Sequence, residues 1–322
     1  MSQGPYRAPW WLPGGHLQTL YGALLCGSSV DWKRERWDTP DGDFIDVDRL
    51  AGPADSPLVV LFHGLEGGSS SHYARALARE LRERAWRCAV PHFRGCSGEP
   101  NRLPRAYHSG DAEEIGWILR RFSGEASGAP LFAIGVSLGG NALLKWLGGD
   151  TRAKDVLAAA AAVSAPVDLM AAGDALGRGF NLVYARAFLS TMKKKGEHKI
   201  ERFPGLFDGK AMRRARTLRE FDDVVTAPLH GFRDTDDYWT RASAKPVLGR
   251  IAVPTLLLNA RNDPFLPAAA LPCPDEVSAH VQCDFPGEGG HAAFVSGPFP
   301  GNLGWMPRRV TGFFEDALAA DG

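Results

Sequence analysis

Ser137 stands at the centre of the pentapeptide Gly-Val-Ser-Leu-Gly, and its hydroxyl could act as a nucleophile. A serine hydroxyl is weakly nucleophilic at neutral pH, so it needs a base within hydrogen-bonding distance and an acid that orients the base. The pentapeptide alone is a weak signal, because glycine-rich turns also carry ordinary surface serines. Here it follows the apolar run 131–136 and precedes a helical pattern, which predicts the tight strand-to-helix turn of a nucleophilic serine.

Asp263 and His291 could supply the acid and the base that such a serine requires. Asp263 follows the apolar run 254–260, and His291 follows a predicted strand over 279–285. The carboxyl ends of parallel strands meet at one edge of a sheet, so both side chains are expected beside Ser137. The chain order Ser, Asp, His also fits hydrolases built around this turn. Taken singly, an aspartate before a proline is typical of a turn, and a histidine after glycines is typical of a loop.

Acyl transfer also needs hydrogen-bond donors for the oxyanion that forms on the substrate, and two backbone N–H groups are candidates. One belongs to Leu138, directly after the serine. The other belongs to Leu65, in the loop His-Gly-Leu-Glu-Gly-Gly that follows the apolar run 58–62. His63, which opens this loop, is interpreted as a buried residue that shapes the loop rather than as a base.

The chain between residues 32 and 163 alternates between strand and helix patterns. A hairpin is predicted over 32–50, with its turn at 40–43. Such alternation implies βαβ crossovers and a mostly parallel central sheet with helices on both faces. After the hairpin, the predicted strands are 58–62, 86–93, 131–136 and 156–163, and the predicted helices are 72–84, 111–122 and 138–147.

The segment 167–250 interrupts this alternation and is predicted to be an inserted helical cap. It mixes glycines and aromatic residues with helical patches and has no strand pattern. Its basic run 193–195 is interpreted as a solvated helix face, and residues 236–238 as a solvated turn. Two further strands and a helix over 307–319 complete the core. We therefore divide the chain into three parts. Residues 1–166 contain the strap and the first part of the core, residues 167–250 form the cap, and residues 251–322 form the second part of the core.

Residues 1–30 are rich in tryptophan, proline and glycine and are interpreted as a strap packed over the core. Contact of its apolar part, 17–25, with a membrane or an acyl chain is the alternative. Prolines and glycines interrupt the apolar residues, so no signal peptide is predicted. The longest uniformly apolar stretches, such as 157–163, fall far short of the roughly 20 residues that cross a bilayer. No transmembrane segment is predicted, and peripheral contact with a membrane stays open.

Composition and charge argue against several classes of protein. Hydrophobic residues make up 44% of the chain and charged residues 23%, as in ordinary soluble globular proteins. The 37 basic and 37 acidic residues balance, so no nucleic-acid partner is predicted. Five cysteines without paired spacing indicate reduced thiols in the cytoplasm, not disulfides or a metal site. No metal or organic cofactor is predicted, and no feature sets the oligomeric state.

Seven motifs are spread over nearly the whole chain. They are Pro-Trp-Trp-Leu-Pro-Gly-Gly-His-Leu-Gln-Thr at 9–19, His-Gly-Leu-Glu-Gly at 63–67, His-Phe-Arg-Gly-Cys-Ser-Gly at 92–98, Tyr-His-Ser-Gly-Asp at 107–111, Gly-Val-Ser-Leu-Gly-Gly at 135–140, Asp-Pro-Phe at 263–265 and Gly-Gly-His at 289–291. Together they resemble the YheT-like branch of the α/β-hydrolase superfamily. The resemblance implies an α/β-hydrolase fold that hydrolyses carboxylic esters without a cofactor, with Ser137, Asp263 and His291 as the catalytic triad. We expect short- to medium-chain acyl esters or acylglycerols as substrates.

Two positions depart from the family pattern. The family often has two consecutive aspartates before the proline, whereas here the first is Asn262, which leaves Asp263 as the only acid there. Some relatives carry an H-x4-D motif linked to acyl transfer, and Glu113 stands at the aspartate position after His108. An acyltransferase that uses the same triad and a non-catalytic binding protein are the alternatives to an esterase. The complete set of catalytic residues argues against the second.

The remaining polar residues near these motifs are given structural roles. His92, Arg94 and Cys96 follow a predicted strand and are expected in a loop at the rim of the site. Asp111 precedes a predicted helix and is interpreted as its N-cap, because aspartate accepts hydrogen bonds from the free N–H groups of a first turn. Cys96 could be a reactive thiol only in surroundings that lower its pKa.

Overall fold

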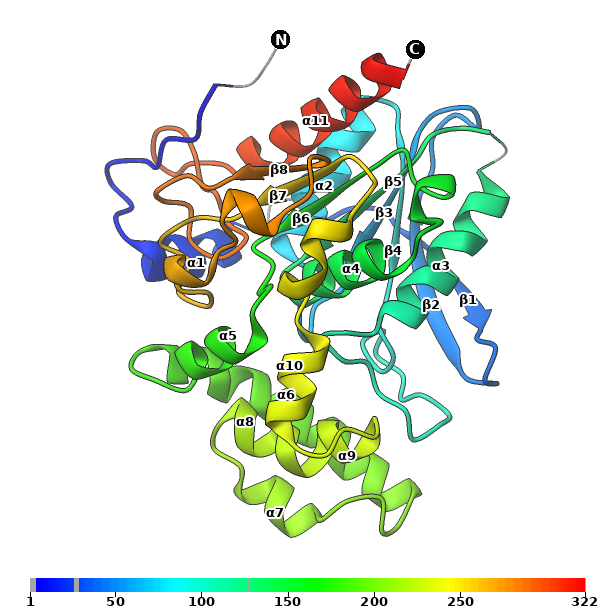
Figure 1. The fold of residues 1–322 in the computed structure, drawn as a ribbon, viewed down its shortest axis with the longest axis vertical. Helices are drawn as coiled ribbons and strands as arrows, with labels where there is room; N and C mark the ends of the chain where they lie inside the picture. Colours follow the sequence, from blue (N-terminus) through cyan, green and yellow to red (C-terminus); the bar gives the residue numbers. More distant parts are fainter. Residues whose placement is uncertain (1–3, 26–28, 127, 322) are drawn as a thin grey trace.

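The computed structural model describes residues 4–25, 29–126 and 128–321. Within these residues an eight-stranded sheet has the order β1-β2-β4-β3-β5-β6-β7-β8 (Figure 1). β1 and β2 form an antiparallel hairpin at one edge, and β3 to β8 run parallel, as predicted. The strands are β1 (Lys33–Asp38), β2 (Phe44–Leu50), β3 (Leu58–Phe62), β4 (Arg87–Pro91), β5 (Leu131–Val136), β6 (Ala159–Val163), β7 (Thr255–Leu258) and β8 (Val281–Asp284).

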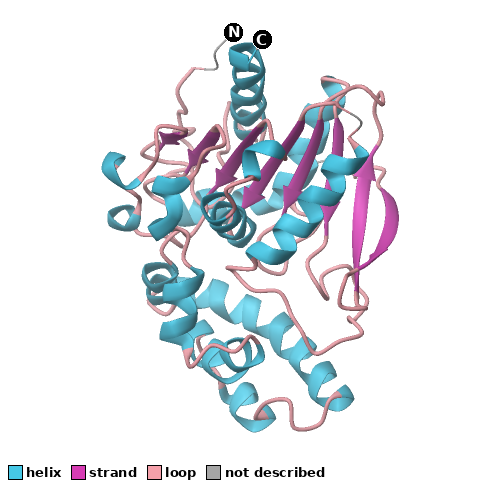
Figure 2. Ribbon diagram, turned by 45° about the vertical axis from the view of Figure 1, so that its right-hand side comes forward, coloured by secondary structure: helices cyan, strands magenta, loops and turns pink. Residues whose placement is uncertain are grey.

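Helices cover both faces of the sheet, which confirms the predicted layers (Figure 2). Two of them pack on one face and two on the other, each pair within its own hydrophobic cluster. Strands covered on both faces must be apolar on both, and this is why the sequence shows them as continuous apolar runs. The first pair is α3 (Ala112–Glu125) and α4 (Leu138–Gly149), and the second pair is α2 (His72–Glu83) and α11 (Trp305–Asp321).

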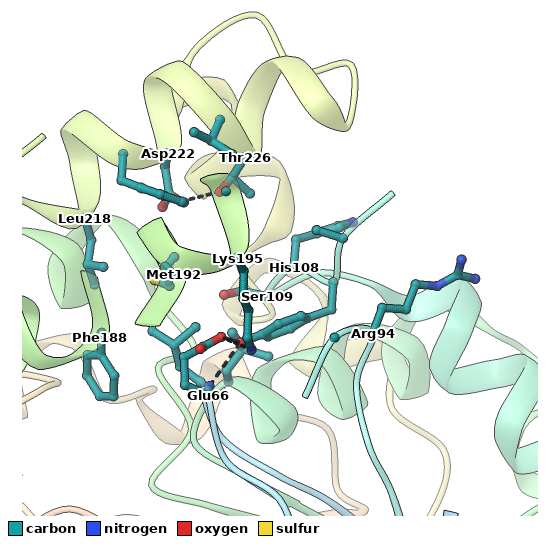
Figure 3. A pocket seen from close by; sticks show the side chains of 18 of the residues that line it. Glu66, Arg94, His108, Ser109, Phe188, Met192, Lys195, Leu218, Asp222 and Thr226 are labelled. Atoms are coloured by element: carbon teal, nitrogen blue, oxygen red, sulfur yellow. Dashed lines mark hydrogen bonds and ion pairs between the residues drawn. The ribbon is translucent and has the colours of Figure 1, made fainter. Parts of the chain in front are cut away.

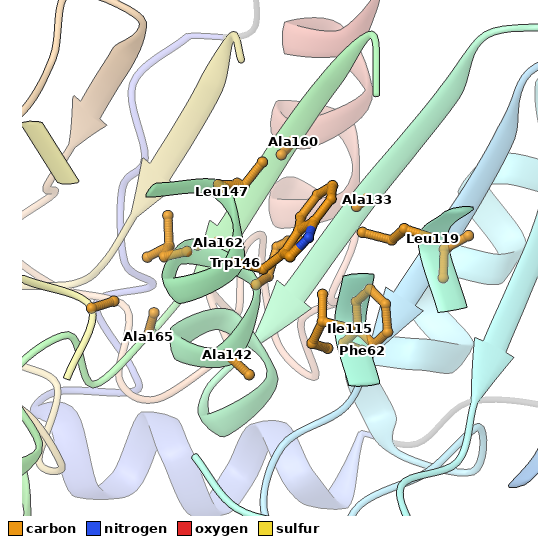
Figure 4. Packing of buried hydrophobic residues seen from close by; sticks show 14 of the residues in the cluster. Phe62, Ile115, Leu119, Ala133, Ala142, Trp146, Leu147, Ala160, Ala162 and Ala165 are labelled. Carbon is orange, nitrogen blue, oxygen red and sulfur yellow. The ribbon is translucent and has the colours of Figure 1, made fainter. Parts of the chain in front are cut away.

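The face under α4 shows how the core is packed (Figure 4). Trp146 and Leu147 of α4 belong to the same buried cluster as Ala160 and Ala162 of β6. Alanines on the strand leave room for the large side chains of the helix, so the two elements approach closely. This close approach fixes the start of α4, which directly follows Ser137.

The predicted strand 156–163 is shorter in the structure, because its first residues belong to a turn. The 3-10 helix η1 (Ala153–Asp155) is followed by hydrogen bonds from the N–H groups of Val156 and Leu157 to the carbonyl of Ala153. These bonds hold Val156 and Leu157 in the turn, and β6 begins only at Ala159. An apolar run cannot by itself distinguish such a turn from a strand.

Residues 169–242 form helices that lie together below the sheet in Figure 1 and make up the predicted helical cap. The cap contains α5 (Leu169–Leu176), α6 (Asn181–Arg202), α7 (Gly209–Arg214), α8 (Leu218–Phe221), the π-helical turn η2 (Asp222–Thr226), α9 (Ala227–Leu229) and α10 (Thr235–Ala242). The boundaries at 167 and 250 remain our proposal. The 3-10 helix η3 (Lys245–Arg250) already packs against α4, and Leu248 joins the core cluster.

The N-terminal strap contains the helix α1 (Gly15–Leu24), whose buried side includes Gln18 and Thr19. Trp10 and Leu24 are 92% and 79% exposed, so the strap also presents apolar side chains to the surroundings. No helix in the described part of the chain combines the length and apolar character that crossing a membrane would require. Two short 3-10 helices, η4 (Ala268–Ala270) and η5 (Pro274–Glu276), complete the described elements.

Candidate active site

Ser137 lies at the turn between β5 and α4, as predicted. Its backbone has φ 54° and ψ −123°, in the left-handed half of φ that non-glycine residues rarely adopt. The turn also depends on its glycines: a Cβ on Gly135 would lie 2.5 Å from the carbonyl oxygen of Gly139, and one on Gly139 would lie 2.5 Å from that of Phe62. Side chains at either position would therefore push the turn apart.

His291 joins Ser137 to Asp263 in one hydrogen-bonded chain. Nε2 of His291 lies 2.9 Å from Oγ of Ser137, and Nδ1 lies 2.9 Å from Oδ2 of Asp263. The side chain of Asp263 is fully buried, and Oδ1 accepts a second hydrogen bond from the N–H of Phe265. With its carboxylate as acceptor, Asp263 favours the tautomer in which Nδ1 carries the proton and Nε2 is free to accept one from Ser137.

The loop after β3 leaves the N–H of Leu65 without a partner in the described structure, while its neighbours are all occupied. The N–H of Gly64 donates to the hydroxyl of Tyr73, and the N–H of Glu66 donates to the hydroxyl of Tyr107. Further along the loop, the N–H of Gly67 donates to the carbonyl of Gly64, and the N–H of Gly68 donates to the hydroxyl of Ser71. Two tyrosines thus hold this loop from either side of Leu65.

The N–H of Leu138 is the second predicted donor, and it is the first N–H of α4. The first N–H groups of a helix have no acceptor within the helix. The following bonds, from Gly140 and Asn141, both end on the carbonyl of Ser137. The described structure shows no acceptor for Leu138, so its N–H is available for an oxyanion, with the positive end of the helix dipole behind it.

A polar network from the strap holds the loop that carries His291. The carbonyl oxygen of the Gln18 side chain accepts hydrogen bonds from the N–H of Gly289 and the amide of Asn262, at 2.9 and 3.0 Å. Asn262 in turn accepts from the N–H of Gly290 at 3.0 Å. Sequence reasoning missed Gln18, although it belongs to the N-terminal motif on which the family resemblance rests. Asn262 acts as both donor and acceptor here, a combination that an ionised aspartate cannot provide.

A cavity of about 710 Å³ opens from Ser137 and His291 into the cap (Figure 3). Phe188 and Met192 of α6 and Leu218 of α8 line one part of it. Within the cap, Asp222 accepts hydrogen bonds from Thr226 and Trp239, and burial raises its pKa to about 6. Further apolar lining residues include Leu169, Ala172, Leu176, Phe221, Val225, Trp239 and Phe265.

His63 and Asp111 have the structural roles expected of them. Nδ1 of His63 donates to the carbonyl of Gly64, Nε2 accepts from the N–H of Phe93, and burial lowers the pKa of His63 to about 3. Asp111 caps α3 by accepting from the N–H of Glu114. Both residues therefore stabilise elements around the site.

The loop of His92, Arg94 and Cys96 borders the cavity, as predicted, and the side chains of His92 and Arg94 are buried. His92 contacts Oδ2 of Asp48 at 2.8 Å, and Arg94 forms an ion pair with Glu114 at 2.6 Å. Burial raises the pKa of the Cys96 thiol, which argues against a reactive thiolate. Of the other cysteines, Cys88, Cys273 and Cys283 are free, and Cys26 lies outside the described residues.

Two interpretations of cap residues were wrong. Lys195 does not lie on a solvated helix face: its Nζ forms an ion pair with Glu66 at 2.7 Å and lines the cavity (Figure 3). Residues 236–238 belong to α10 rather than to a turn, and Tyr238 is buried, with its hydroxyl accepting from the N–H of Ser109. Both errors arose because the sequence alone did not show which side of the cap faces the core.

His108 lies in a second buried cluster that also lines the cavity. Its ring centroid is 4.5 Å from that of His230, and burial lowers its pKa to about 4. Glu113, at the position of the aspartate in the H-x4-D motif, is exposed on α3. Within the described residues, no group of three or more His, Cys, Asp or Glu side chains is arranged to hold a metal ion.

Comparisons with known proteins agree with this geometry. Residues 57–298 match the family described as the alpha/beta hydrolase fold. YheT of Escherichia coli (strain K12), named a putative esterase, is 39% identical over 95% of this chain and 91% of its own length. Phospholipase ABHD3 of Mus musculus is 32% identical over 89% and 72% of the two chains. A solved bacterial membrane phospholipase A has the same fold, with a TM-score of 0.57 at 15% identity over 94% and 89% of the chains.

Proposed function

This chain belongs to the α/β-hydrolase family, in the branch that includes YheT, and from this premise we propose that it is a serine esterase. The reaction is the hydrolysis of carboxylic esters through an acyl-enzyme on Ser137. The observation that carries the proposal is the hydrogen-bonded chain from Ser137 through His291 to Asp263, with 2.9 Å at each step. These distances suit direct proton transfer between the serine and the imidazole.

The first half of the proposed reaction forms the acyl-enzyme. His291 takes the proton of Ser137 as Oγ attacks the ester carbonyl carbon. The N–H groups of Leu65 and Leu138 then donate to the carbonyl oxygen, which has become an oxyanion. The tetrahedral intermediate collapses, and the alcohol leaves with the proton that His291 returns to it.

The second half releases the acid. His291 removes a proton from a water molecule, and the resulting hydroxide attacks the acyl carbonyl. The same two N–H groups stabilise the second tetrahedral intermediate, and Ser137 leaves with the proton from His291. Asp263 stabilises the imidazolium that forms in each half, and the hydrogen bond to Phe265 holds its carboxylate in place.

We propose that the apolar part of the cavity binds the acyl chain of the substrate. Phe265 lies against the imidazole of His291, with ring centroids 4.1 Å apart and the rings tilted by 33°, and Phe188 of the cap lies against Phe265. An apolar surface therefore runs from the base into the cap. Short- to medium-chain acyl esters or acylglycerols fit such a surface, because apolar contact with each buried methylene contributes about 0.8 kcal/mol.

The test is a panel of p-nitrophenyl esters of increasing chain length, hydrolysed by the wild type and by Ser137→Ala. We expect the substitution to lower kcat by several orders of magnitude, up to about 10⁶-fold, because the nucleophile is lost. Ser190→Ala is the matched control, since Ser190 is exposed on α6 and bonds only to the carbonyl of Ala187. Undiminished hydrolysis by Ser137→Ala would contradict the proposal.

The same assays separate esterase from the two alternative functions. Adding an alcohol acceptor and comparing ester product with free acid measures acyl transfer. Labelling of Ser137 by a fluorophosphonate probe measures whether the serine is activated, and a non-catalytic binding protein would show no labelling. We also propose that the protein works in the cytoplasm, a compartment consistent with the free thiols of its described cysteines.

A further inference from the structure

Several basic residues of α6 line the cavity, namely Lys194, Lys195, His198, Lys199 and Arg202. Among them, Lys195, Lys199 and Arg202 are spaced by four and three residues, which places these three along a single face of the helix. They follow the apolar residues Phe188 and Met192, which line the cavity on earlier turns of the same helix. The cavity therefore has an apolar part and a part rich in cations, which Glu66, Glu99 and Glu201 also line, and both parts connect to Ser137.

The cations differ in how their charge is balanced. Lys195 forms an ion pair with Glu66 at 2.7 Å. Among the described residues, no carboxylate lies within 4.0 Å of Lys199 or Arg202. Lys199 donates to the carbonyls of residues 103 and 105, and Arg202 donates to the carbonyl of Asn101. These three bonds leave donors unused, because a lysine has three N–H groups and an arginine has five.

Burial makes an unbalanced charge at Lys199 costly. Desolvation lowers the pKa of Lys199 to about 8. The positive charges of Arg94, Arg202 and Lys195 also lower this pKa, whereas the negative charge of Asp43 raises it. A half-buried ammonium with no described carboxylate within 4.0 Å would be stabilised by an anion in the cavity, since the attraction between opposite charges strengthens away from bulk water.

The position of these cations relative to the reacting groups is set by the helix. Lys195 contacts Glu66, the residue next to the predicted oxyanion donor Leu65. Lys199 lies one turn further, about 6 Å along the axis at 1.5 Å per residue. A group bound there can belong to the same small molecule as an ester carbonyl beside Ser137.

We propose that Lys199 and Arg202 bind an oxyanion group, a phosphate or a carboxylate, carried by the ester substrate. This inference rests on the proposed esterase function and narrows its substrate class to anionic acyl esters. The apolar part of the cavity receives the acyl chain, and the cationic part receives the charged end of the same molecule. Their common opening to Ser137 favours an anion attached to the substrate over a free ion.

The test compares matched esters that differ only in charge. One pair is octanoylglycerol phosphate and octanoylglycerol, which places the anion on the alcohol portion. A second pair is the p-nitrophenyl monoesters of suberic acid and of octanoic acid, which places it at the end of the acyl chain. We expect kcat/KM to be at least tenfold higher for the anionic member of one pair, mainly through KM. Raising the ionic strength should reduce this ratio, because salt screens charges near the surface.

Variants identify the residues that produce the preference. Lys199→Met combined with Arg202→Met should lower the ratio of kcat/KM for the anionic over the neutral ester at least fivefold. The single variant Lys199→Arg, which keeps the positive charge, should retain most of the wild-type ratio. Lys193→Met is the matched control, because Lys193 also lies on α6 and donates to two backbone carbonyls, those of Arg213 and Ala215, but does not line the cavity. Its ratio should equal that of the wild type.

The possible failures can be told apart. Hydrolysis of neutral esters without any preference for anionic ones would overturn the inference and leave the esterase proposal standing. A preference that survives in the double variant would place the anion elsewhere and also overturn it. Inhibition by inorganic phosphate that is equally strong in the wild type and the double variant would contradict a role for Lys199 and Arg202. Absence of hydrolysis with every ester would contradict the esterase function itself.

Discussion

The backbone N–H of His291 donates a 2.9 Å hydrogen bond to Oγ1 of Thr19, although the two residues are 272 positions apart in the sequence. The hydroxyl of Thr19 donates in turn to the carbonyl of Gly15 within α1. Gln18 binds the same loop through the N–H of Gly289. The strap therefore positions the loop that carries His291, in addition to covering the core.

Thr19→Val tests this positioning role, because valine keeps the shape of threonine and removes the acceptor oxygen. We expect kcat for a neutral p-nitrophenyl ester to fall about tenfold, the effect of about 1.4 kcal/mol on the barrier, with a much smaller change in KM. The loss should affect kcat because the imidazole is misplaced relative to Ser137 while the substrate cavity is unchanged.

Thr191→Val is the control for this substitution, since Thr191 is exposed on α6 and bonds to a carbonyl of its own helix. Thermal unfolding of both variants measures any general loss of stability. A variant at Thr19 that loses stability but keeps the wild-type kcat and the wild-type rate of fluorophosphonate labelling would show that the strap is only structural.

The sequence predicted the core well because its signals are local. The strands β3 and β5 begin and end where the apolar runs 58–62 and 131–136 do, since burial on both faces leaves no polar position in them. The three site residues were found because each follows a strand at the same edge of the sheet. Their hydrogen-bonding distances agree with that prediction, and their catalytic roles remain a proposal.

Residues whose roles depend on distant contacts could not be predicted in this way. Gln18 contacts loops near residues 262 and 289, and nothing in the pattern around it indicates those partners. Lys195 was interpreted as solvated because a basic run normally is, yet the cap folds back and pairs it with Glu66. The direction in which a helical segment faces depends on tertiary packing, which periodicity alone does not specify for an inserted cap.

Asp263→Asn should lower kcat by about 10⁴-fold while the fold is retained, because an amide at this position no longer favours the productive tautomer of His291. The measurement is kcat on the best ester of the panel, together with thermal unfolding. Asp275→Asn is the control, since Asp275 is exposed in η5. Activity of Asp263→Asn within tenfold of the wild type would show that another group orients the base.

Met192→Trp should shift the preferred acyl chain to shorter lengths. Met192 lines the apolar part of the cavity between Phe188 and the basic residues of α6, so an indole there would fill space that longer chains need. We expect the kcat/KM for p-nitrophenyl octanoate to fall at least tenfold relative to that for p-nitrophenyl butyrate. Each methylene that can no longer be buried removes about 0.8 kcal/mol of favourable binding free energy. Unchanged relative rates would place the acyl chain in another part of the cavity.

Asp222 should make the free energy of unfolding depend on pH in a defined direction. Burial raises the pKa of Asp222 to about 6 in the folded protein, against 3.8 in the unfolded chain. Between these values the folded state binds more protons, so the contribution of Asp222 to stability falls as the pH rises through this window. Below about pH 4 and above about pH 6 its contribution is constant, and the full change is roughly 3 kcal/mol.

Asp222→Asn isolates this contribution, because asparagine does not titrate. The amide changes the hydrogen bonds from Thr226 and Trp239 by an amount that does not vary with pH, so the slope is the informative quantity. We expect the free energy of unfolding of the variant, minus that of the wild type, to increase between pH 4 and pH 6 and then to level off. Denaturant unfolding at several pH values measures it. A difference that stays flat over this window would mean that the carboxyl group keeps an ordinary pKa inside the cap, and one that decreases would mean that its pKa is lowered there.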